Sequence, residues 1–302
     1  EGIDRVAPVG GKSHSITRLK ILRTGLRILT GDPPDLHDRQ EVDEVYIREY
    51  GKENGKVLLF FPGSCEPWQE YAQAAEELAR HFHVLLVVPD GQDPEEHTDF
   101  ISVEKTVDDT AAWLKEHGID HLDALYGLSY GGGMVTRFLV TQDIPVDKAI
   151  IDAGTAPYEF PKWICRLIGL RDFLMIKIGR ASTAVMKAAF PPERFARNPD
   201  KADEEYLKIR RYLKNYSNRT LWNIFWSANN YHVPHPAPKL NTVIQFWIGT
   251  DEWGSRFRDL KWYQRYLPQL ELVKIPNMMH GEFVIMHPKK FAEKALAFYE
   301  QK

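Results

Sequence analysis

The stretch that decides the fold lies near the middle of the chain and reads Leu125-Tyr126-Gly127-Leu128-Ser129-Tyr130-Gly131-Gly132-Gly133. It contains the pattern G-x-S-x-G, follows an apolar run and precedes a segment with helical spacing of apolar residues. A serine on a sharp strand-to-helix turn projects its hydroxyl above the sheet, and flanking glycines let neighbouring backbone pass close by. The stretch therefore predicts a strand, a turn that carries a nucleophilic Ser129, and a helix. The alternative interpretation is a serine that only caps the helix.

Short apolar segments alternate with amphipathic segments on both sides of this turn, from residue 44 onward. The predicted strands are Glu44–Glu49, Lys56–Phe61, His83–Val88, Asp123–Leu128, Lys148–Asp152, Val243–Ile248 and Leu270–Ile275. The predicted helices are Trp68–Arg80, Val103–His117, Tyr130–Thr141, Asp259–Tyr266 and His287–Gln301. Several strands are apolar without strict alternation, as expected when helices cover both faces of a sheet. The pattern predicts an α/β protein with a mostly parallel, doubly wound sheet and helices on both faces.

The alternation stops between residues 154 and 239, where the sequence is helix-like and rich in aromatic residues. Because the strand–helix rhythm resumes afterwards, we expect this segment to be a helical cap inserted into one domain. The predicted organisation is an N-terminal helical extension (1–42), a core formed by 43–153 and 240–302, and the cap (154–239).

A serine nucleophile needs a base, and the base needs a carboxylate that orients it. On this type of turn the chain order is serine, then an acid, then histidine. His280 follows the last predicted strand and precedes the last predicted helix, so we predict that it is the base. A buried loop histidine with a structural hydrogen bond is the alternative. Two neighbouring carboxylates, Asp251 and Glu252, follow the strand Val243–Ile248.

With these residues in place, the sequence from Glu44 to Lys302 resembles the α/β-hydrolase superfamily. The resemblance implies the α/β-hydrolase fold with an inserted helical cap. In that family the acid commonly follows a strand-ending glycine after two further residues, which leads here from Gly249 to Glu252. A shift by one residue selects Asp251, and Asp152 stands where some members carry the acid. Glu252 is favoured narrowly over Asp251, Asp152 ranks third, and the choice stays open at this point.

The resemblance also implies two backbone N–H donors for the negatively charged oxygen of the reaction intermediate. One belongs to Tyr130, directly after the nucleophile. The other comes from the loop between Phe61 and Trp68, and we assign it to Ser64 rather than to Cys65. Relatives often carry His-Gly where this chain has Pro-Gly, which removes a side-chain donor but leaves the backbone donor.

We expect an apolar substrate pocket lined by Gly63, Cys65, Trp68, Trp163 and Trp226. No histidine motif accompanies Cys65, so a cysteine nucleophile is not favoured. His232 and His235 lack a third ligand at a recognisable spacing, and the prolines Pro234 and Pro236 beside them suit a rigid connection better than a zinc site. We therefore predict no metal and no organic cofactor.

Composition excludes several classes of protein. The chain has 302 residues and a formal net charge of −3, which lacks the basic field of a nucleic-acid binder. Its apolar runs are far shorter than the roughly 20 residues of a membrane-spanning helix. The two cysteines, Cys65 and Cys165, are interpreted as reduced thiols of a cytoplasmic protein. Secretion is not excluded, since the given sequence starts without methionine.

Residues 15–30 combine leucines at helical spacing with arginine and lysine and contain no acidic residue. This pattern predicts a helix that either docks on a protein surface or makes peripheral contact with a membrane. The oligomeric state is not indicated by the sequence.

The sequence thus predicts a serine hydrolase that cleaves carboxylic esters or related acyl compounds of small to medium, hydrophobic substrates through an acyl-enzyme intermediate. Two alternatives remain. One is an amidase, peptidase or lactonase with the same triad, and the other is a slow or non-catalytic ligand-binding receptor on a hydrolase scaffold.

Overall fold

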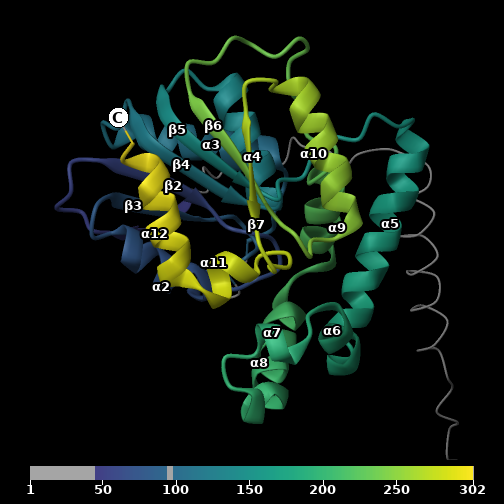
Figure 1. Ribbon diagram of the computed structural model, residues 1–302. Coiled ribbons are helices and arrows are strands. Elements are labelled where there is room, and N and C mark those ends of the chain that lie inside the picture. Colours follow the sequence, from purple (N-terminus) through teal and green to yellow (C-terminus); the bar gives the residue numbers. More distant parts are fainter. Residues whose placement is uncertain (1–44, 94–97, 302) are drawn as a thin grey trace, which may run out of the picture. The chain divides into compact units, whose positions relative to one another are not determined.

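A single seven-stranded sheet organises the computed structural model, which describes residues 45–93 and 98–301 (Figure 1). The strands are β1 (Tyr46–Tyr50), β2 (Val57–Phe61), β3 (His83–Val88), β4 (Leu122–Leu128), β5 (Val146–Asp152), β6 (Val243–Gly249) and β7 (Glu271–Ile275). Their order across the sheet is β1-β3-β2-β4-β5-β6-β7. Strand β1 pairs antiparallel with β3, and all other pairs are parallel. The predicted mostly parallel sheet is confirmed.

Helices cover both faces of the sheet, as predicted. The core helices are α2 (Gln69–Leu78), α3 (Val103–Glu116), α4 (Tyr130–Thr141), α10 (Gly254–Tyr266), α11 (Glu282–Met286) and α12 (Pro288–Tyr299). Successive strand residues point to opposite faces. Leu59 and Leu125 therefore pack with α3, α4 and α10 in one apolar layer. Phe60 and Tyr126 pack with α2, α11 and α12 in the other.

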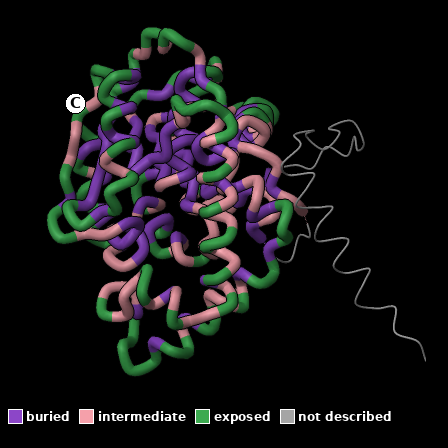
Figure 2. Tube along the Cα trace, turned by 90° about the vertical axis from the view of Figure 1, so that its right-hand side faces the viewer, coloured by how far each residue is buried: buried purple, intermediate pink, exposed green. Residues whose placement is uncertain are grey.

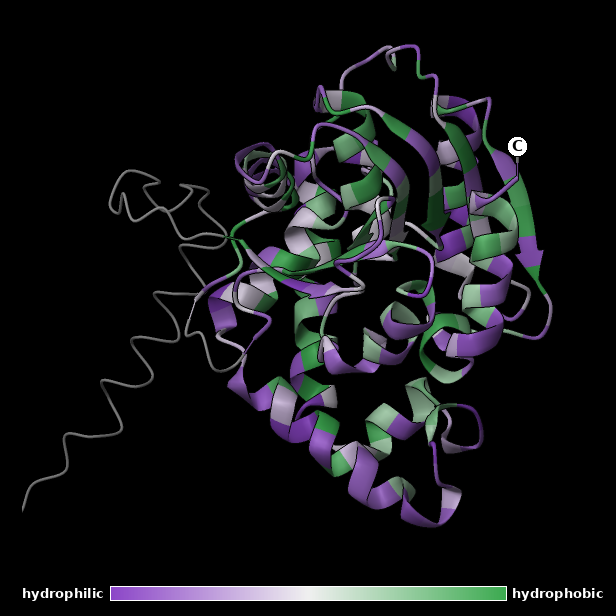
Figure 3. Cartoon of the chain, turned by 90° about the vertical axis from the view of Figure 1, so that its left-hand side faces the viewer, coloured by the Kyte–Doolittle hydropathy of each residue, from purple (hydrophilic) through white to green (hydrophobic). Residues whose placement is uncertain are grey.

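All seven strands and five core helices predicted from the sequence are present, with ends that differ by a few residues. Helix α10 begins five residues before the predicted start at Asp259, and the short α11 was not predicted. The strands are mainly hydrophobic and the helices carry both kinds of residue, which Figure 3 shows as green and mixed green and purple. This is the pattern of a sheet enclosed between two amphipathic layers.

The register of the parallel strands brings their carboxyl ends to one edge. Leu128 at the end of β4 pairs with Asp152 at the end of β5, and Asp152 pairs with Trp247 in β6. Gly249 at the end of β6 pairs with Ile275 at the end of β7. The segments that follow these four strands therefore meet at the same edge, where open α/β sheets place their ligands.

Helices alone occupy the chain between β5 and β6. They are α5 (Lys162–Gly179), α6 (Thr183–Ala189), α7 (Pro192–Phe195), the 3-10 helix η1 (Pro199–Lys201), α8 (Ala202–Asn215) and α9 (Asn218–Ser227). We call residues 154–239 the cap, and the division of the chain at these boundaries stays a prediction. Much of the cap is exposed or half-buried, whereas the strands are largely buried (Figure 2).

The predicted N-terminal extension (1–42), with the amphipathic segment 15–30, lies outside the described residues. Among the helices that are described, none is both long and apolar enough to span a bilayer. Cys65 and Cys165 are both free thiols, as the sequence interpretation expected.

Candidate active site

Ser129 lies on a tight turn between β4 and α4. Its backbone angles, φ 55° and ψ −117°, are strained for a residue with a side chain. The turn requires its glycines, since a Cβ on Gly127 would lie 2.3 Å from the carbonyl oxygen of Gly131. A Cβ on Gly131 would lie 2.4 Å from the carbonyl oxygens of Phe61 and Pro62. The G-x-S-x-G pattern thus lets helix α4 begin directly against the loop that follows β2.

Neighbouring backbone holds the turn in place. The N–H of Ser129 donates to the carbonyl of Asp152 (2.7 Å), and the N–H of Thr155 donates to the carbonyl of Ser129 (2.9 Å). Both partners belong to the end of β5 and the segment after it. The strained backbone of Ser129 is therefore held through both its N–H and its carbonyl.

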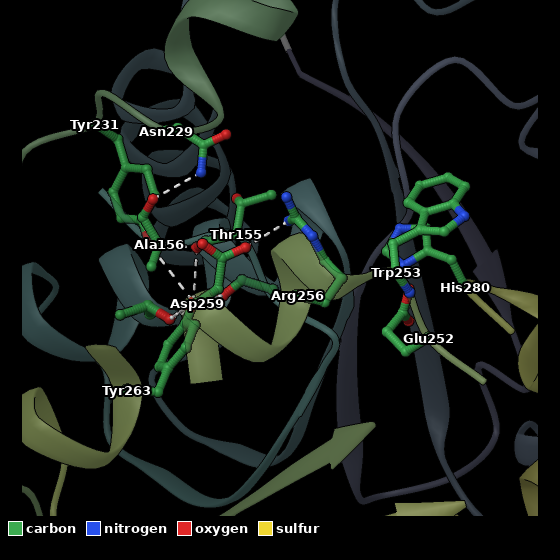
Figure 4. Close-up of polar contacts among 12 residues, drawn as sticks. Thr155, Ala156, Asn229, Tyr231, Glu252, Trp253, Arg256, Asp259, Tyr263 and His280 are labelled. Carbon is green, nitrogen blue, oxygen red and sulfur yellow. Dashed lines mark hydrogen bonds and ion pairs between the residues drawn. The ribbon is translucent and has the colours of Figure 1, made fainter. Parts of the chain in front are cut away.

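His280 contacts Glu252. The Nδ1 atom of His280 lies 3.0 Å from Oε2 of Glu252, and the two side chains are only 10% and 1% exposed. The other carboxylate oxygen of Glu252 accepts the N–H of Trp253 (2.7 Å), and the Trp253 ring stacks on His280 with 4.7 Å between centroids (Figure 4). Carboxylate and indole together fix the orientation of the imidazole.

The other two candidate acids have different partners. Asp251 is exposed and accepts a hydrogen bond from Nη1 of Arg194 (2.9 Å). Asp152 is buried, accepts from the hydroxyl of Tyr126 (2.8 Å), and has a pKa that burial raises to about 7. Of the three carboxylates that the sequence left open, Glu252 is therefore the one that contacts His280.

The segments that carry Ser64, Ser129 and His280 meet around one side chain, that of Leu128. Its Cδ2 would lie 3.1 Å from a Cβ on Gly63 and 3.3 Å from a Cβ on Gly281. Gly281 directly follows His280, and Leu128 directly precedes Ser129. Residues that are more than 150 positions apart in the chain are thus brought to neighbouring positions at the edge of the sheet.

The loop after β2 is held by a buried hydrogen-bond chain. The N–H of Gly63 donates to the hydroxyl of Tyr71 (3.0 Å), which in turn donates to Glu66. Burial raises the pKa of the Glu66 carboxyl to about 7. The N–H of Gly63 is therefore engaged, and the choice of Ser64 over Cys65 as the donor of this loop stays a prediction. Tyr130 is the first residue of α4, so its N–H has no acceptor within the helix.

Cys65 occupies the same loop with φ 65°. Burial raises the pKa of its thiol to about 12, and the nearby charge of Glu66 acts in the same direction. A thiol in this environment stays protonated near neutral pH, whereas nucleophilic cysteines have lowered pKa values. The environment of Cys65 therefore agrees with a lining residue rather than a nucleophile.

Arg194, in helix α7 of the cap, joins the two segments that carry Glu252 and His280. Its Nη1 donates to Asp251 (2.9 Å), its Nε donates to the buried Glu282 (2.9 Å), and its Nη2 donates to the carbonyl of Asn277. Glu282 also accepts the N–H of Met279, next to His280 (2.8 Å). No spacing in the sequence indicated Arg194, because its partners lie 57 to 88 positions away.

A second cap residue reaches the loop after β2. Tyr212 in α8 donates to the carbonyls of Gln92 and Glu66, and Tyr216 donates to the Tyr212 hydroxyl (3.0 Å). Gln92 donates in turn to the hydroxyl of Tyr130 (3.1 Å). Tyr212 bonds the cap to the segments after β2 and β3, on one side of β4, and Arg194 bonds it to the segments after β6 and β7, on the other side.

The segment after β5 is anchored by a cluster beside the candidate site (Figure 4). The hydroxyls of Tyr231 and Tyr263 donate to the carbonyl of Thr155 (2.8 and 2.9 Å). Asp259 forms a buried ion pair with Arg256 (2.9 Å), and burial raises the pKa of its carboxyl to about 6. The two tyrosines thus hold Thr155, whose N–H donates to the carbonyl of Ser129.

The three tryptophans predicted to line the pocket have separate environments. Trp68 packs against the guanidinium of Arg48, 4.4 Å from the ring centroid. Trp226 stacks on Trp222 between α9 and α5, and Trp163 is 64% exposed. None of these contacts involves Ser129, Glu252 or His280. A role of the three tryptophans in substrate binding therefore stays a prediction.

One group of potential metal ligands occurs within the described ranges: His121, Asp123 and Asp147, whose ligand atoms lie within 4.8 Å of one another. It is at the amino ends of β4 and β5, away from the segments that follow these strands. Asp123 accepts the N–H of Val57 (2.8 Å) and His121 contacts Asp147 (3.2 Å). The candidate active site does not include these residues.

The family model described as alpha/beta hydrolase family matches residues 58–294, and the chain therefore belongs to that family. Three similar solved structures illustrate the range of its relatives. An alpha/beta hydrolase enzyme from a deep-sea metagenome library of the Medee basin is 18% identical and has a TM-score of 0.70, with 85% of this chain and 94% of that chain covered. A thermophilic esterase from Thermogutta terrifontis is 18% identical (TM-score 0.63; 84% and 92% covered). An enol-lactonase from Burkholderia xenovorans is 14% identical (TM-score 0.63; 85% and 96% covered).

At these low sequence identities, the structural similarity supports the fold alone. Membership of the family supports a hydrolase. A search of curated proteins finds no match to this sequence.

Proposed function

We propose that this protein is a serine hydrolase that cleaves carboxylic esters of small to medium, hydrophobic substrates. The observation that carries the proposal is the buried contact of 3.0 Å between His280 Nδ1 and Glu252 Oε2, at the sheet edge that also bears the strained Ser129 turn. A carboxylate at Nδ1 keeps the proton of the neutral imidazole on that nitrogen, so Nε2 is free to act as a base.

In the proposed reaction, Nε2 of His280 takes the hydroxyl proton as Ser129 attacks the acyl carbonyl. The N–H groups of Ser64 and Tyr130 donate to the resulting oxyanion. His280 then protonates the leaving alcohol, and the acyl group stays on Ser129. A water molecule, deprotonated by His280, attacks this acyl-enzyme. The bond between the acyl carbon and Oγ of Ser129 then breaks, His280 returns the proton to Oγ, and the acid is released. Glu252 stabilises the imidazolium that forms in each step.

Arg194 has a positioning role in this proposal. It bonds to Asp251, beside the acid, and through Glu282 to the segment around His280. The cap thereby holds the acid and the base at a fixed separation. Because an error of about 1 Å in such a geometry can lower a rate about 100-fold, this support matters for catalysis.

The same triad also serves amide, peptide and lactone hydrolysis, and the solved neighbours include esterases and an enol-lactonase. Esters remain our proposal because esterases are among the solved neighbours that share this fold. We also keep a cytoplasmic location as a proposal, which is supported by the two free thiols.

The test uses a fluorophosphonate probe and a panel of p-nitrophenyl esters, lactones and anilides. We expect the full chain to be labelled and to turn over short-chain esters, and Ser129→Ala to lose labelling and at least about 10⁴-fold in kcat/KM. The exposed Ser255 provides the control variant Ser255→Ala, which should retain both. Labelling that persists in Ser129→Ala contradicts the nucleophile, and labelling without turnover of any substrate favours a ligand-binding protein.

A further inference from the structure

An exposed apolar face lies along the outer side of helix α5. Of the nine large hydrophobic side chains that are exposed in the described parts of the chain, six belong to residues 160–178. They are Phe160 (43%), Trp163 (64%), Leu167 (54%), Leu174 (49%), Met175 (55%) and Ile178 (50%). Trp163, Leu167, Leu174 and Ile178 follow one another at intervals of four, seven and four residues, which places them on one stripe of the helix. We call these six residues the α5 face.

The opposite side of α5 is already occupied. Gly169 is buried where a Cβ would lie 3.7 Å from Trp226 of α9, and Cys165 is also buried. Phe173 packs edge-on against Trp222, again from α9. Helix α5 therefore uses one side to pack on α9 at the margin of the molecule (Figure 1), and the α5 face is the side left to solvent.

The charges around the α5 face have one predominant sign. Helix α5 contains Lys162, Arg166, Arg171 and Lys177 against a single acidic residue, Asp172. Lys177 donates to Asn218 of α9 (2.7 Å), and Arg180 at the C-terminal cap donates to the carbonyl of Tyr216 (3.3 Å), so the basic residues that border the α5 face are Lys162, Arg166 and Arg171. Asp172 is bonded to Arg171, so it compensates the charge of that residue. The chain as a whole carries a formal net charge of −3, so this helix differs in sign from the rest of the protein.

We propose that the α5 face docks the protein on an anionic lipid bilayer, with the apolar side chains among the headgroups and the basic residues facing anionic lipid. An apolar stripe bordered by lysine and arginine, with tryptophan near one end, is the composition of helices that lie in the plane of a membrane surface. The helix is not apolar enough to span the bilayer.

A second copy of this chain fits the α5 face less well, because two such helices would bring their basic residues together. The inference does not depend on the proposed hydrolase activity. It concerns a different surface of the cap from the one that contacts Asp251 and Glu282.

The experiment measures sedimentation of the full chain with vesicles of phosphatidylcholine alone and with vesicles that contain phosphatidylglycerol. We expect binding to the anionic vesicles that weakens with salt. The double variant Leu167→Gln/Leu174→Gln should bind at least about tenfold more weakly, whereas Leu207→Gln should bind like the parent protein, since Leu207 is an exposed leucine on α8 (37%). Thermal unfolding of each variant verifies that it folds.

A second variant, Lys162→Glu/Arg166→Glu, leaves the apolar residues unchanged and should abolish the preference for anionic vesicles. Three results overturn the proposal. The first is that the protein does not bind anionic vesicles at low salt. The second is that both α5 variants bind like the parent protein, whereas replacing the basic residues of segment 15–30 by glutamine removes binding. The third is that the parent protein self-associates and the leucine variant does not. The last two assign lipid binding to the N-terminal segment and the α5 face to a second copy, respectively.

Discussion

The carboxyl edge of the sheet and the cap use similar residues for different purposes. At the sheet edge, the strand register determines where Ser129, Asp152, Glu252 and His280 lie, and most of these groups are buried. In the cap, hydrophobic residues are divided between packing on α9 and exposure on α5, and the polar contacts to the core come from single side chains such as Arg194. Position in a parallel sheet thus restricts the role of a residue far more than position on a cap helix does.

The two adjacent carboxylates allow the most direct test of the difference between sheet edge and cap, because Glu252 contacts His280 and Asp251 contacts Arg194 of the cap. We expect Glu252→Gln to lower kcat about 10⁴-fold, because the amide cannot orient and charge-stabilise the imidazole in the same way. The matched variant Asp251→Asn should cost less than about tenfold, as expected for an exposed ion pair. Steady-state kinetics on one ester measure both, and a larger loss in Asp251→Asn would transfer the role of the acid to that residue.

Replacing Arg194 tests how much the cap contributes to catalysis at the sheet edge. We expect Arg194→Gln to lower kcat about 10- to 100-fold with a smaller change in KM, because the segments of the acid and the base lose their common partner. Arg197→Gln is the control, since Arg197 joins the cap to Glu70 of α2 through an exposed ion pair (2.8 Å). Arg194→Lys should restore part of the activity. Equal losses in both glutamine variants would indicate a general requirement for cap attachment.

The smallest effect that we expect is the contribution of the buried Asp152 to the pH dependence of the free energy of unfolding. Burial raises its pKa in the folded protein to about 7, above the ordinary value of 3.8. Between these two values the folded state binds the proton more tightly than the unfolded state, so the contribution of Asp152 to the free energy of unfolding falls as pH rises through about 7 and is constant above.

Urea denaturation between about pH 5 and pH 8 tests this sign. The parent protein should lose stability relative to Asp152→Asn as pH rises, because asparagine does not ionise. Parallel stability curves for the two proteins would mean that Asp152 does not titrate in this range.

The positions of the candidate residues could be predicted where they follow strands. Ser129 stands directly after the apolar strand β4, and His280 lies in the loop that follows β7. The ends of parallel strands meet at one edge whatever the detailed packing. The sequence favoured Glu252 over Asp251 only narrowly, because one residue of difference in the loop reverses which side chain points to the histidine. The contact to His280 is a property of the folded loop, in which Asp251 donates its N–H to the carbonyl of Met278 (3.1 Å).

The cap was less predictable. Its aromatic content suggested a pocket, yet Trp222, Trp226 and Phe173 pack between two cap helices, and Trp163 is among the most exposed large apolar side chains. Helical periodicity identifies an apolar side of a helix but does not say what that side contacts. Arg194 could not be found at all, since a single arginine has no distinctive spacing.

By itself the sequence determined the class of fold and the order of its elements. The alternation of apolar strands with amphipathic helices, and the glycines around Ser129, act over a few residues and leave a local signal. Only the tertiary structure decided that Glu252 rather than its neighbour contacts His280, that Arg194 joins the two segments around them, and that α5 leaves its apolar side to solvent. These contacts join residues tens of positions apart or depend on which helix packs where, and the free energy of such packing has no counterpart in local periodicity.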